Sequence, residues 1–284
     1  MEVLHKGSDF PQNGSLVLGF FDGVHLAHQS VIGAAEKSPV IVVTFSYSPI
    51  EYFGKHFEYI YDRSKNYSIM EMFNVDYVYE QDFSEIAHLQ AEEYLNTLIR
   101  IFNPRMLCSG YNHTFGANRQ GNSDFIKKMQ LPFKYICVPA CRYENELVSS
   151  TKIKEFLSSG NIELANKILT RNFTLKSKVV EGMKLGRKIG FPTANLEYPE
   201  KIVKIPYGVY MVKVFNKLAV MNWGVKPTVG ASEILEVHIP DFNGDLYGLE
   251  LEIEILKKIR DERKFSSIEE LKMQIEKDIE TCLK

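Results

Sequence analysis

The chain has 284 residues, of which 45% are hydrophobic and 25% are charged, and its formal net charge is −2. This length suits one large or two ordinary domains, and the composition suits a chain that buries a core and stays soluble. A nearly balanced charge argues against nucleic acid or an anionic membrane as a partner, because both attract strongly basic proteins.

The cysteines and the N-terminus favour a cytoplasmic protein. The four thiols, which form no C-x-x-C pair, are those of Cys108, Cys137, Cys141 and Cys282. We therefore expect reduced, packed cysteines and no zinc site. Residues 1–6 lack the apolar stretch of a signal peptide, and no apolar run in the chain is long enough to span a bilayer.

In the first half, short apolar runs alternate with helical patterns. The runs expected to be strands are residues 15–21, 39–45, 75–79, 105–108 and 135–138. Residues 90–102 carry apolar side chains at helical spacing. Strands that alternate with helices predict a Rossmann-like α/β domain with a parallel sheet, which binds ligands at the carboxyl ends of its strands.

The pattern changes near residue 170. Ser149-Ser150-Thr151 precedes a helix that ends at Gly160, and a short helix is expected at residues 163–169. The strands expected after these helices are residues 174–180, 207–215, 218–222, 235–239 and 249–256. Close-spaced strands with glycine and proline between them predict a small antiparallel barrel. We therefore expect two domains, residues 1–172 and 173–284.

The last segment predicts a helix that packs on the barrel. Ser266 and Glu269 have the spacing of a capping box at its start. The apolar stripe expected to face the barrel consists of Ile268, Leu271, Ile275 and Ile279.

Residues 182–195 combine glycines, an arginine and two oxygen-bearing side chains. The residues that could approach phosphate oxygens through backbone N–H groups or positive charge are Gly182, Gly186, Arg187 and Gly190. Thr193 and Asn195 follow Pro192 and lie two apart, so they share one face of an extended segment. Their oxygens could hold Mg²⁺ beside a nucleotide. The alternative is a β-turn with a polar face and no ligand.

Glu236 lies in residues 235–239, where apolar and polar side chains alternate, and His238 shares its side of the expected strand. A carboxylate near a metal-bound nucleotide could accept the proton of an attacking hydroxyl. The alternative is a surface glutamate on a strand.

Several segments of the second half follow the order found in riboflavin kinase modules. They are GMKLGRKIGFPTANL, IPYGVY, NWGVKPT, LEVHIPDFNGDLYG and RDERKFSSIEELKMQIEKDI. The resemblance covers nearly all of residues 180–280. It implies a six-stranded split barrel with a C-terminal helix, which transfers the γ-phosphoryl group of ATP to the 5′-hydroxyl of riboflavin. By this resemblance Thr193 and Asn195 are Mg²⁺ and ATP ligands, and Glu236 is the catalytic base. The stretch from Gly182 then covers the nucleotide.

In the first half, His25 and His28 follow the first expected strand and lie three apart, so they share a face if a helix begins there. Two imidazoles at a helix N-terminus can contact nucleotide phosphates and stabilise charge that develops at the α-phosphorus. The alternative is that both are ordinary histidines, partly buried or at the surface, without a role in ligand binding.

The segments GFFDGVHLAHQ, VVTFSYSP, SGYNHTFGANRQG and VSSTKIKEFLSSGNIELANKIL resemble the nucleotidyltransferase domain of FAD synthetases across most of residues 14–170. Together the two halves resemble the bifunctional riboflavin kinase/FAD synthetases of prokaryotes. The resemblance implies that FMN and ATP give FAD and pyrophosphate, with His25 and His28 on the ATP phosphates. The other implied nucleotide and flavin contacts are Gly19, Phe20, Asp22, Gly23, Asn112, Arg119, Ser149, Ser150 and Thr151.

Three positions depart from the adenylyltransferase pattern. Ala27 replaces the usual glycine, Ser48 a histidine and Lys154 an arginine. An added methyl group can crowd a triphosphate, and lysine lacks the bidentate fork of arginine. Three functions therefore stay open at this point: the bifunctional enzyme, a riboflavin kinase with an impaired first domain, and a flavin- or nucleotide-binding regulator without turnover.

Overall fold

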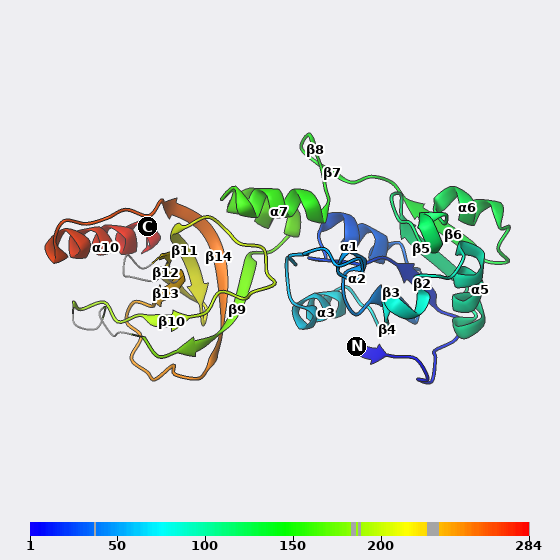
Figure 1. Ribbon diagram of the computed structural model, residues 1–284, viewed down its shortest axis with the longest axis horizontal. Coiled ribbons are helices and arrows are strands. Elements are labelled where there is room, and N and C mark those ends of the chain that lie inside the picture. Colours follow the sequence, from blue (N-terminus) through cyan, green and yellow to red (C-terminus); the bar gives the residue numbers. More distant parts are fainter. Residues whose placement is uncertain (37, 183–185, 187–188, 226–232, 284) are drawn as a thin grey trace. The chain divides into compact units, whose positions relative to one another are not determined.

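The computed structural model describes residues 1–36, 38–182, 186, 189–225 and 233–283 (Figure 1). The chain divides into two compact units, residues 1–150 and 151–284. The boundary expected between residues 172 and 173 falls inside the second unit, between α8 (Ile162–Leu169) and β9 (Phe173–Val180). As the border between two functions it stays a prediction.

The first unit is built on a six-stranded parallel sheet with the order β1-β4-β3-β2-β5-β6. Its strands are β1 (Glu2–Leu4), β2 (Ser15–Leu18), β3 (Val40–Phe45), β4 (Tyr77–Gln81), β5 (Met106–Gly110) and β6 (Lys134–Val138). The predicted parallel α/β sheet is confirmed. The sequence does not indicate β1, because three residues at the sheet edge are too few to show a pattern.

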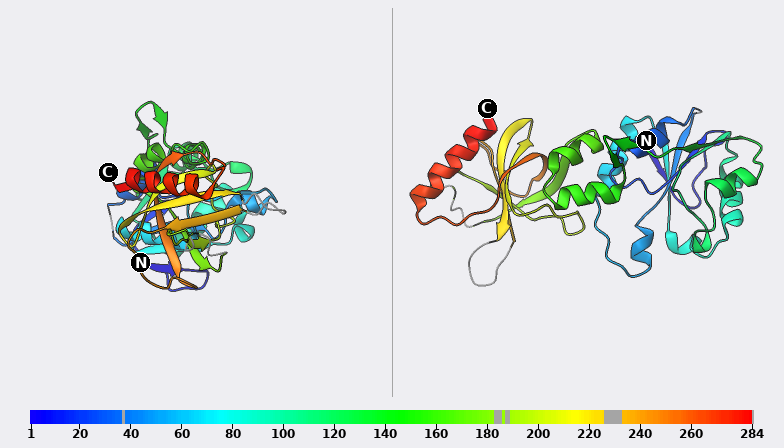
Figure 2. Two further views of the ribbon diagram at one scale, coloured as in Figure 1. Left: turned by 90° about the vertical axis from the view of Figure 1, so that its left-hand side faces the viewer. Right: turned by 90° about the horizontal axis from the view of Figure 1, so that it is seen from above.

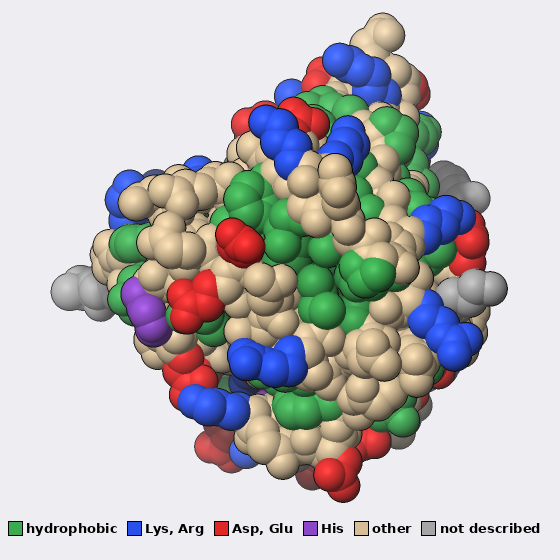
Figure 3. Space-filling model, turned by 90° about the vertical axis from the view of Figure 1, so that its right-hand side faces the viewer, with side chains coloured by type: hydrophobic (Ala, Val, Ile, Leu, Met, Phe, Trp, Pro, Cys, Tyr) green, Lys and Arg blue, Asp and Glu red, His purple; other side chains and the backbone are tan. Residues whose placement is uncertain are grey.

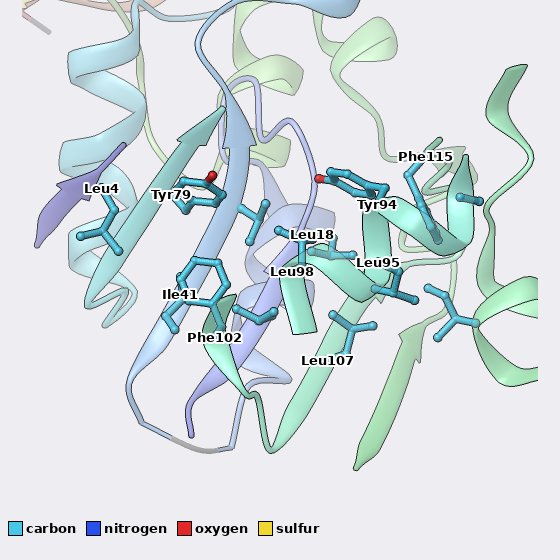
Figure 4. Close-up of a cluster of buried hydrophobic side chains, with 14 residues drawn as sticks. Leu4, Leu18, Ile41, Tyr79, Tyr94, Leu95, Leu98, Phe102, Leu107 and Phe115 are labelled. Atoms are coloured by element: carbon cyan, nitrogen blue, oxygen red, sulfur yellow. The ribbon is translucent and has the colours of Figure 1, made fainter. Parts of the chain in front are cut away.

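Helices cover this sheet, and α5 supplies much of the core. The helices are α1 (Leu26–Gly33), α2 (Pro49–Tyr52), α3 (Arg63–Met72), α4 (Phe83–Ile86), α5 (Ala91–Phe102), the short helix η1 (Ala117–Arg119) and α6 (Ser123–Lys128). Tyr94, Leu95, Leu98 and Phe102 of α5 are buried against the strands, as Figure 4 shows. Burial of this apolar stripe holds the sheet together and so fixes the strand ends.

The end of the first unit that carries α5 and α6 has hydrophobic side chains grouped in its middle (Figure 3). Phe125, Met129, Leu131 and Phe133 of this unit are partly buried and pack against its core. Charged side chains of both signs are interspersed around the group.

After β7 (Arg142–Tyr143) and β8 (Glu146–Leu147), α7 (Ser150–Ser158) and α8 lead into a closed antiparallel barrel with the order β10-β13-β12-β11-β14-β9. Its other strands are β10 (Ala194–Leu196), β11 (Gly208–Val214), β12 (Lys217–Val225), β13 (Glu233–His238) and β14 (Glu250–Arg260). Asn166 ties α8 to the barrel, because its amide donates to the carbonyl oxygen of Ile255 at 2.9 Å and accepts from the N–H of Phe173 at 2.7 Å. The predicted six-stranded barrel is confirmed.

The capping box of α10 (Ile268–Leu283) lies one residue later than expected. The hydroxyl of Ser267 accepts from the N–H of Glu270 at 3.1 Å, and the Glu270 carboxylate accepts from the N–H of Ser266 at 2.9 Å. The pairing of Ser266 with Glu269 is therefore wrong. Because the helix begins at Ile268, Ser267 is its N-cap, and the box uses the third helical residue.

α10 lies along the outside of the barrel (Figure 2). Ile279 and Cys282 pack near Val209 and Val220, and Leu271 and Ile275 are half-buried. Ile268 is 53% exposed, so the predicted stripe is partly covered except at its first residue. A bidentate ion pair between Arg260 of β14 and Asp278 of α10, at 2.8 to 3.1 Å, reinforces this packing. In the described part of the chain, no helix has the length and apolar character needed to cross a bilayer.

Candidate active sites

The first candidate site lies at the carboxyl ends of the central parallel strands. β2 has β3 on one side and β5 on the other, so the strand order reverses around it. Such a switch point opens a crevice in which α/β sheets bind ligands. The turn after Leu18 of β2 and Asn112, two residues beyond the end of β5, both lie at this edge.

The turn after β2 requires glycine at two positions. A Cβ on Gly19 would lie 2.8 Å from the ring of Phe21, and a Cβ on Gly23 would lie 2.7 Å from Cδ1 of Ile60. Gly23 also has a φ of +83°. Its N–H donates to Oδ1 of Asn66 at 2.9 Å, which anchors the turn to α3. Glycine therefore permits both the close approach and the backbone conformation.

The same turn gathers several of the predicted contacts. Asp22 is buried, and its Oδ1 accepts from the N–H of Ile60 at 2.9 Å. The hydroxyl of Ser150 donates to the carbonyl oxygen of Asp22 at 2.9 Å, so the start of α7 adjoins the turn. The hydroxyl of Thr44 donates to the carbonyl oxygen of Phe20 at 3.2 Å. A cavity beside the turn is lined by Phe20, Asp22, Thr44, Tyr59, Arg63 and Asn66.

His25 and His28 form a stacked pair at the start of α1. His25 is the N-cap residue, and its Nδ1 accepts from the N–H of His28 at 3.4 Å. The two rings are parallel within 16°, with centroids 3.6 Å apart, and the ring of Phe21 meets His28 edge-on. The expected sharing of one face is confirmed.

Burial, and secondarily the charge of His25, hold the pKa of His28 well below 6.5. Nδ1 of His28 is buried and has no hydrogen-bond partner within the described residues. A neutral imidazole carries its proton on one nitrogen only, so His28 is a neutral hydrogen-bond donor or acceptor in the absence of ligand. An arriving phosphate would favour the protonated form, because opposite charges attract strongly where water is excluded.

The remaining predicted contacts of this half are less closely grouped. Asn112 is exposed beyond β5, and its Oδ1 is 3.5 Å from the position of a Cβ on Gly110. Arg119 is exposed in η1, where its backbone N–H donates to the carbonyl oxygen of Gly116 at 3.0 Å, and its guanidinium makes no hydrogen bond or ion pair with a described residue. Ser149 is half-buried and Thr151 is exposed. Their roles as nucleotide or flavin contacts stay predictions.

The structure gives Ser48 a task that sequence reasoning did not identify. Its side chain is 2% exposed and accepts from the N–H of Ile50 at 3.2 Å, which caps α2. The residue that replaces the usual histidine therefore starts a helix. Ala27 lies in the first turn of α1, whereas Lys154 lies in the middle of α7, so two of the three departures occur at helix N-termini.

The second candidate site lies on the outer face of the barrel. Asn195 of β10 is directly opposite Glu236 of β13. Opposed residues on antiparallel strands point to the same face, with their Cβ atoms about 4.5–5.5 Å apart. Ala194 and Val237 are buried in the barrel interior, so Asn195 and Glu236 face outward. Thr193, two residues before Asn195, continues this face.

The predicted glycine-rich segment lies against these side chains. A Cβ on Gly182 would overlap the side-chain amide of Asn195, and a Cβ on Gly186 would lie 3.3 Å from Oγ1 of Thr193. Gly190 has a φ of +95°. The structure thus brings together five of the predicted residues of this half, namely Gly182, Gly186, Thr193, Asn195 and Glu236, while Arg187 lies outside the described residues.

His238 stabilises the segment that carries Thr193. Its Nδ1 is 2.8 Å from the carbonyl oxygen of Pro192, and its ring meets that of Phe191 edge-on. The ring nitrogen must donate, because a carbonyl oxygen only accepts. The sequence placed His238 on the side of Glu236 but gave it no task, because the contact joins residues 46 positions apart.

A divalent cation would find oxygen ligands on this face. In the described ranges no three His, Cys, Asp or Glu side chains gather into a metal cluster. The candidates are the hydroxyl of Thr193 and the amide oxygen of Asn195, next to the carboxylate of Glu236. Mg²⁺ prefers hard oxygen ligands and usually takes only one or two from protein when it also binds nucleotide phosphates. The donor set therefore fits Mg²⁺.

Comparison with known proteins agrees with this division of the chain. An FAD synthetase family model matches residues 8–152, and a riboflavin kinase family model matches residues 169–284. The bifunctional riboflavin kinase/FMN adenylyltransferase of Haemophilus influenzae is 36% identical, with 98% of this chain and 96% of the relative covered. That of Buchnera aphidicola is 35% identical, with 99% and 96% covered.

A solved structure has the same fold over the whole chain. It is a Streptococcus pneumoniae protein described as a macrolide-efflux protein, with a TM-score of 0.91, 30% identity, and 99% and 98% of the two chains covered. That description concerns the other protein and adds nothing to the two sites. The family models and the full-length relatives agree on both halves, and this chain belongs to the bifunctional riboflavin kinase/FMN adenylyltransferase family.

Proposed function

We propose that this enzyme makes FAD from riboflavin in two ATP-dependent steps. The barrel phosphorylates riboflavin to FMN, with Glu236 as the base, and the first unit adenylylates FMN, with His25 and His28 on the ATP phosphates. A cytoplasmic location, expected from the sequence, remains part of this proposal.

One arrangement carries the kinase assignment: Asn195 lies opposite Glu236, with Thr193 on the same face and Gly182 and Gly186 against the two ligands. Glycine backbone close to two oxygen ligands suits a nucleotide phosphate, because it offers N–H donors without a side chain in the way. The carboxylate is then beside the phosphoryl group that is transferred.

The kinase reaction follows from this placement. The 5′-oxygen of riboflavin forms a bond to the γ-phosphorus of ATP as the bond to the β,γ-bridging oxygen breaks, and ADP leaves. The hydroxyl proton passes to the carboxylate of Glu236. Thr193 and Asn195 fix the position of the nucleotide phosphates, and His238 fixes the backbone before Thr193. Mg²⁺ would be held by Thr193 and Asn195 and would neutralise phosphate charge there.

Asn195→Ala should raise the Mg²⁺ concentration needed for half-maximal riboflavin phosphorylation by about 10-fold or more. The reason is the loss of a charge-assisted oxygen contact, worth about 1.5–3 kcal/mol. The measurement is initial rate against free Mg²⁺ at fixed ATP. Asn216→Ala, at the exposed tip of the β11–β12 hairpin, should leave the curve unchanged. An unchanged Mg²⁺ requirement in Asn195→Ala would reject this residue as a ligand.

The adenylyl transfer needs no covalent enzyme nucleophile. An FMN phosphate oxygen forms a bond to the α-phosphorus of ATP, and pyrophosphate leaves with the bond to the α,β-bridging oxygen. Negative charge grows on the phosphate oxygens, so the protein must supply hydrogen-bond donors there. The stacked histidines at the N-terminus of α1 supply them, since helix N-termini favour anions.

A riboflavin kinase with an impaired first unit is the second candidate. It is favoured by Ser48, whose side chain caps α2 instead of replacing the function of a histidine, and by Ala27 in the first turn of α1. Against it stand the glycine-dependent turn and the contact of Ser150 with Asp22, both of which are intact.

One product assay separates these functions. Purified protein is incubated with riboflavin, ATP and Mg²⁺, and the flavins are separated by chromatography. We expect FMN first and FAD later. If FMN is the only product from riboflavin, and no FAD forms from added FMN even when the flavin is reduced, the result would favour the impaired first unit. Tight flavin binding without ATP consumption would instead point to a regulator and contradict both enzymatic proposals.

A further inference from the structure

We propose that Arg63 binds a substrate phosphate in adenylyl transfer, with the buried carboxylate of Glu80 holding its guanidinium in place. The inference rests on the proposed function of the first unit. Arg63 lies in the first turn of α3 and lines the cavity beside the turn after β2, together with Phe20 and Asp22 of that turn. Among the described residues that line this cavity, Arg63 is the only basic one.

The sheet brings Glu80 to the same edge as the turn. Glu80 lies near the carboxyl end of β4 and pairs in register with Thr44 of β3, so both side chains leave the sheet on one face. The hydroxyl of Thr44 donates to the carbonyl oxygen of Phe20 at 3.2 Å, and β3 lies between β4 and β2. The carboxylate therefore stands two strands, roughly 10 Å, from the strand whose turn leads to the histidines.

Two side chains from one face of α3 fix the carboxylate of Glu80. Nη1 of Arg63 pairs with Oε1 of Glu80, and the hydroxyl of Tyr67 donates to Oε2 at 3.1 Å. Arg63 and Tyr67 lie four positions apart, so they share a face of the helix. The side chain of Glu80 is 6% exposed, whereas that of Arg63 is 55% exposed. Within the described residues the guanidinium uses one of its five N–H donors, so the others can reach a ligand.

Stability alone does not account for a cation at this position. The N-terminus of a helix carries partial positive charge, so an arginine in the first turn of α3 is unfavourable for the helix. An ion pair with an enclosed partner gains little over apolar side chains of similar size, because taking charge out of water is costly. A ligand with negative charge explains both features, since it pairs with the guanidinium and is favoured at the helix N-terminus.

The ligand chemistry that fits Arg63 is a phosphate. A guanidinium binds phosphate oxygens through paired N–H donors in a planar fork. Adenylyl transfer brings two such anions to this edge of the sheet, the phosphate of FMN and the triphosphate of ATP. The two sources differ in which Michaelis constant rises when Arg63 is replaced.

The first test measures FAD formation from FMN in Arg63→Met, which keeps the length of the side chain but removes its charge and its donors. The KM for the substrate whose phosphate is bound, FMN or ATP, should rise about 10-fold or more, because a charge-assisted contact is lost. Arg63→Lys, which keeps the charge without the fork, should recover part of this loss. Riboflavin phosphorylation should stay at the wild-type rate in both variants. Arg100→Met, in the last turn of α5 and exposed, is the control and should leave both activities unchanged.

A second variant separates substrate binding from charge balance. Arg63→Met leaves an enclosed carboxylate unpaired, which by itself destabilises a fold. The double variant Arg63→Met/Glu80→Gln removes both charges, and we expect it to keep the raised KM. If its KM values return to those of Glu80→Gln, the guanidinium serves only to neutralise Glu80 and the inference is overturned. Wild-type KM values in Arg63→Met would overturn it as well. If Arg63→Met does not fold, the double variant decides.

Failure of the proposed function has a different signature. A wild-type protein that forms no FAD from FMN would contradict adenylyl transfer itself. Titration calorimetry with inorganic pyrophosphate then decides on Arg63, because it needs no turnover. Binding about 10-fold weaker in the double variant than in Glu80→Gln would support the phosphate site. Equal binding in these two variants would overturn it.

Discussion

Glu236→Gln should lower kcat for riboflavin phosphorylation by about 10²–10⁴-fold, the usual contribution of a general base. Glutamine keeps the size and the acceptor oxygen of the side chain but cannot take up the proton of the 5′-hydroxyl. ATP binding should change little, because Thr193, Asn195 and the glycine-rich segment are untouched. The measurements are kcat from initial rates of FMN formation and the Kd for ATP·Mg²⁺ by titration calorimetry.

Glu233→Gln is a matched control for this variant. Glu233 begins the same strand, is exposed, and pairs with Lys204 at 2.7 Å and with the hydroxyl of Tyr207 at 2.9 Å. An exposed ion pair contributes about 0–1 kcal/mol, so this control should fold and phosphorylate riboflavin at nearly the wild-type rate. A wild-type rate in Glu236→Gln would show that the base is another group.

His28→Ala should lower FAD formation from FMN by about 10²–10³-fold, the typical loss for one donor to a developing oxyanion. FMN formation from riboflavin should stay within about 2-fold of the wild-type rate, because that reaction takes place in the other unit. Separate single-turnover assays of the two steps measure both effects in one preparation.

His88→Ala provides the comparison for the His28 variant, since His88 is an exposed histidine outside the turn after β2. Both of its activities should match the wild type. Equal loss of both activities in His28→Ala would indicate misfolding. FAD formation at the wild-type rate would show that His28 does not assist adenylyl transfer.

Burial of histidine also predicts how stability depends on pH. The pKa of His28 lies well below 6.5, mainly through burial, and burial lowers the pKa of His113 to about 4. The unfolded chain binds protons near pH 6.5 that the folded chain does not, so the contribution of these groups to the free energy of unfolding is fully present above pH 6.5. It declines as the pH falls toward the folded pKa values.

Local sequence patterns determined much of this protein. The alternation of apolar runs with helical segments predicted the parallel sheet, and the change to close-spaced strands after residue 170 predicted the barrel. Both predictions were possible because the periodicity of apolar residues follows directly from backbone geometry. The spacing of Thr193 and Asn195 placed both on one face, since side chains of an extended chain alternate. The spacing of His25 and His28 likewise predicted that both lie on one face at the start of α1.

Only the tertiary structure decided which strands lie side by side. Asn195 and Glu236 lie opposite each other because the closed barrel and its core fix the register of β10 and β13. Residues more than a dozen positions apart leave no periodic signal of such a pairing, so the sequence did not indicate that these two side chains are neighbours. The stacking of the two histidines and the capping of α2 by Ser48 depend likewise on packing around them.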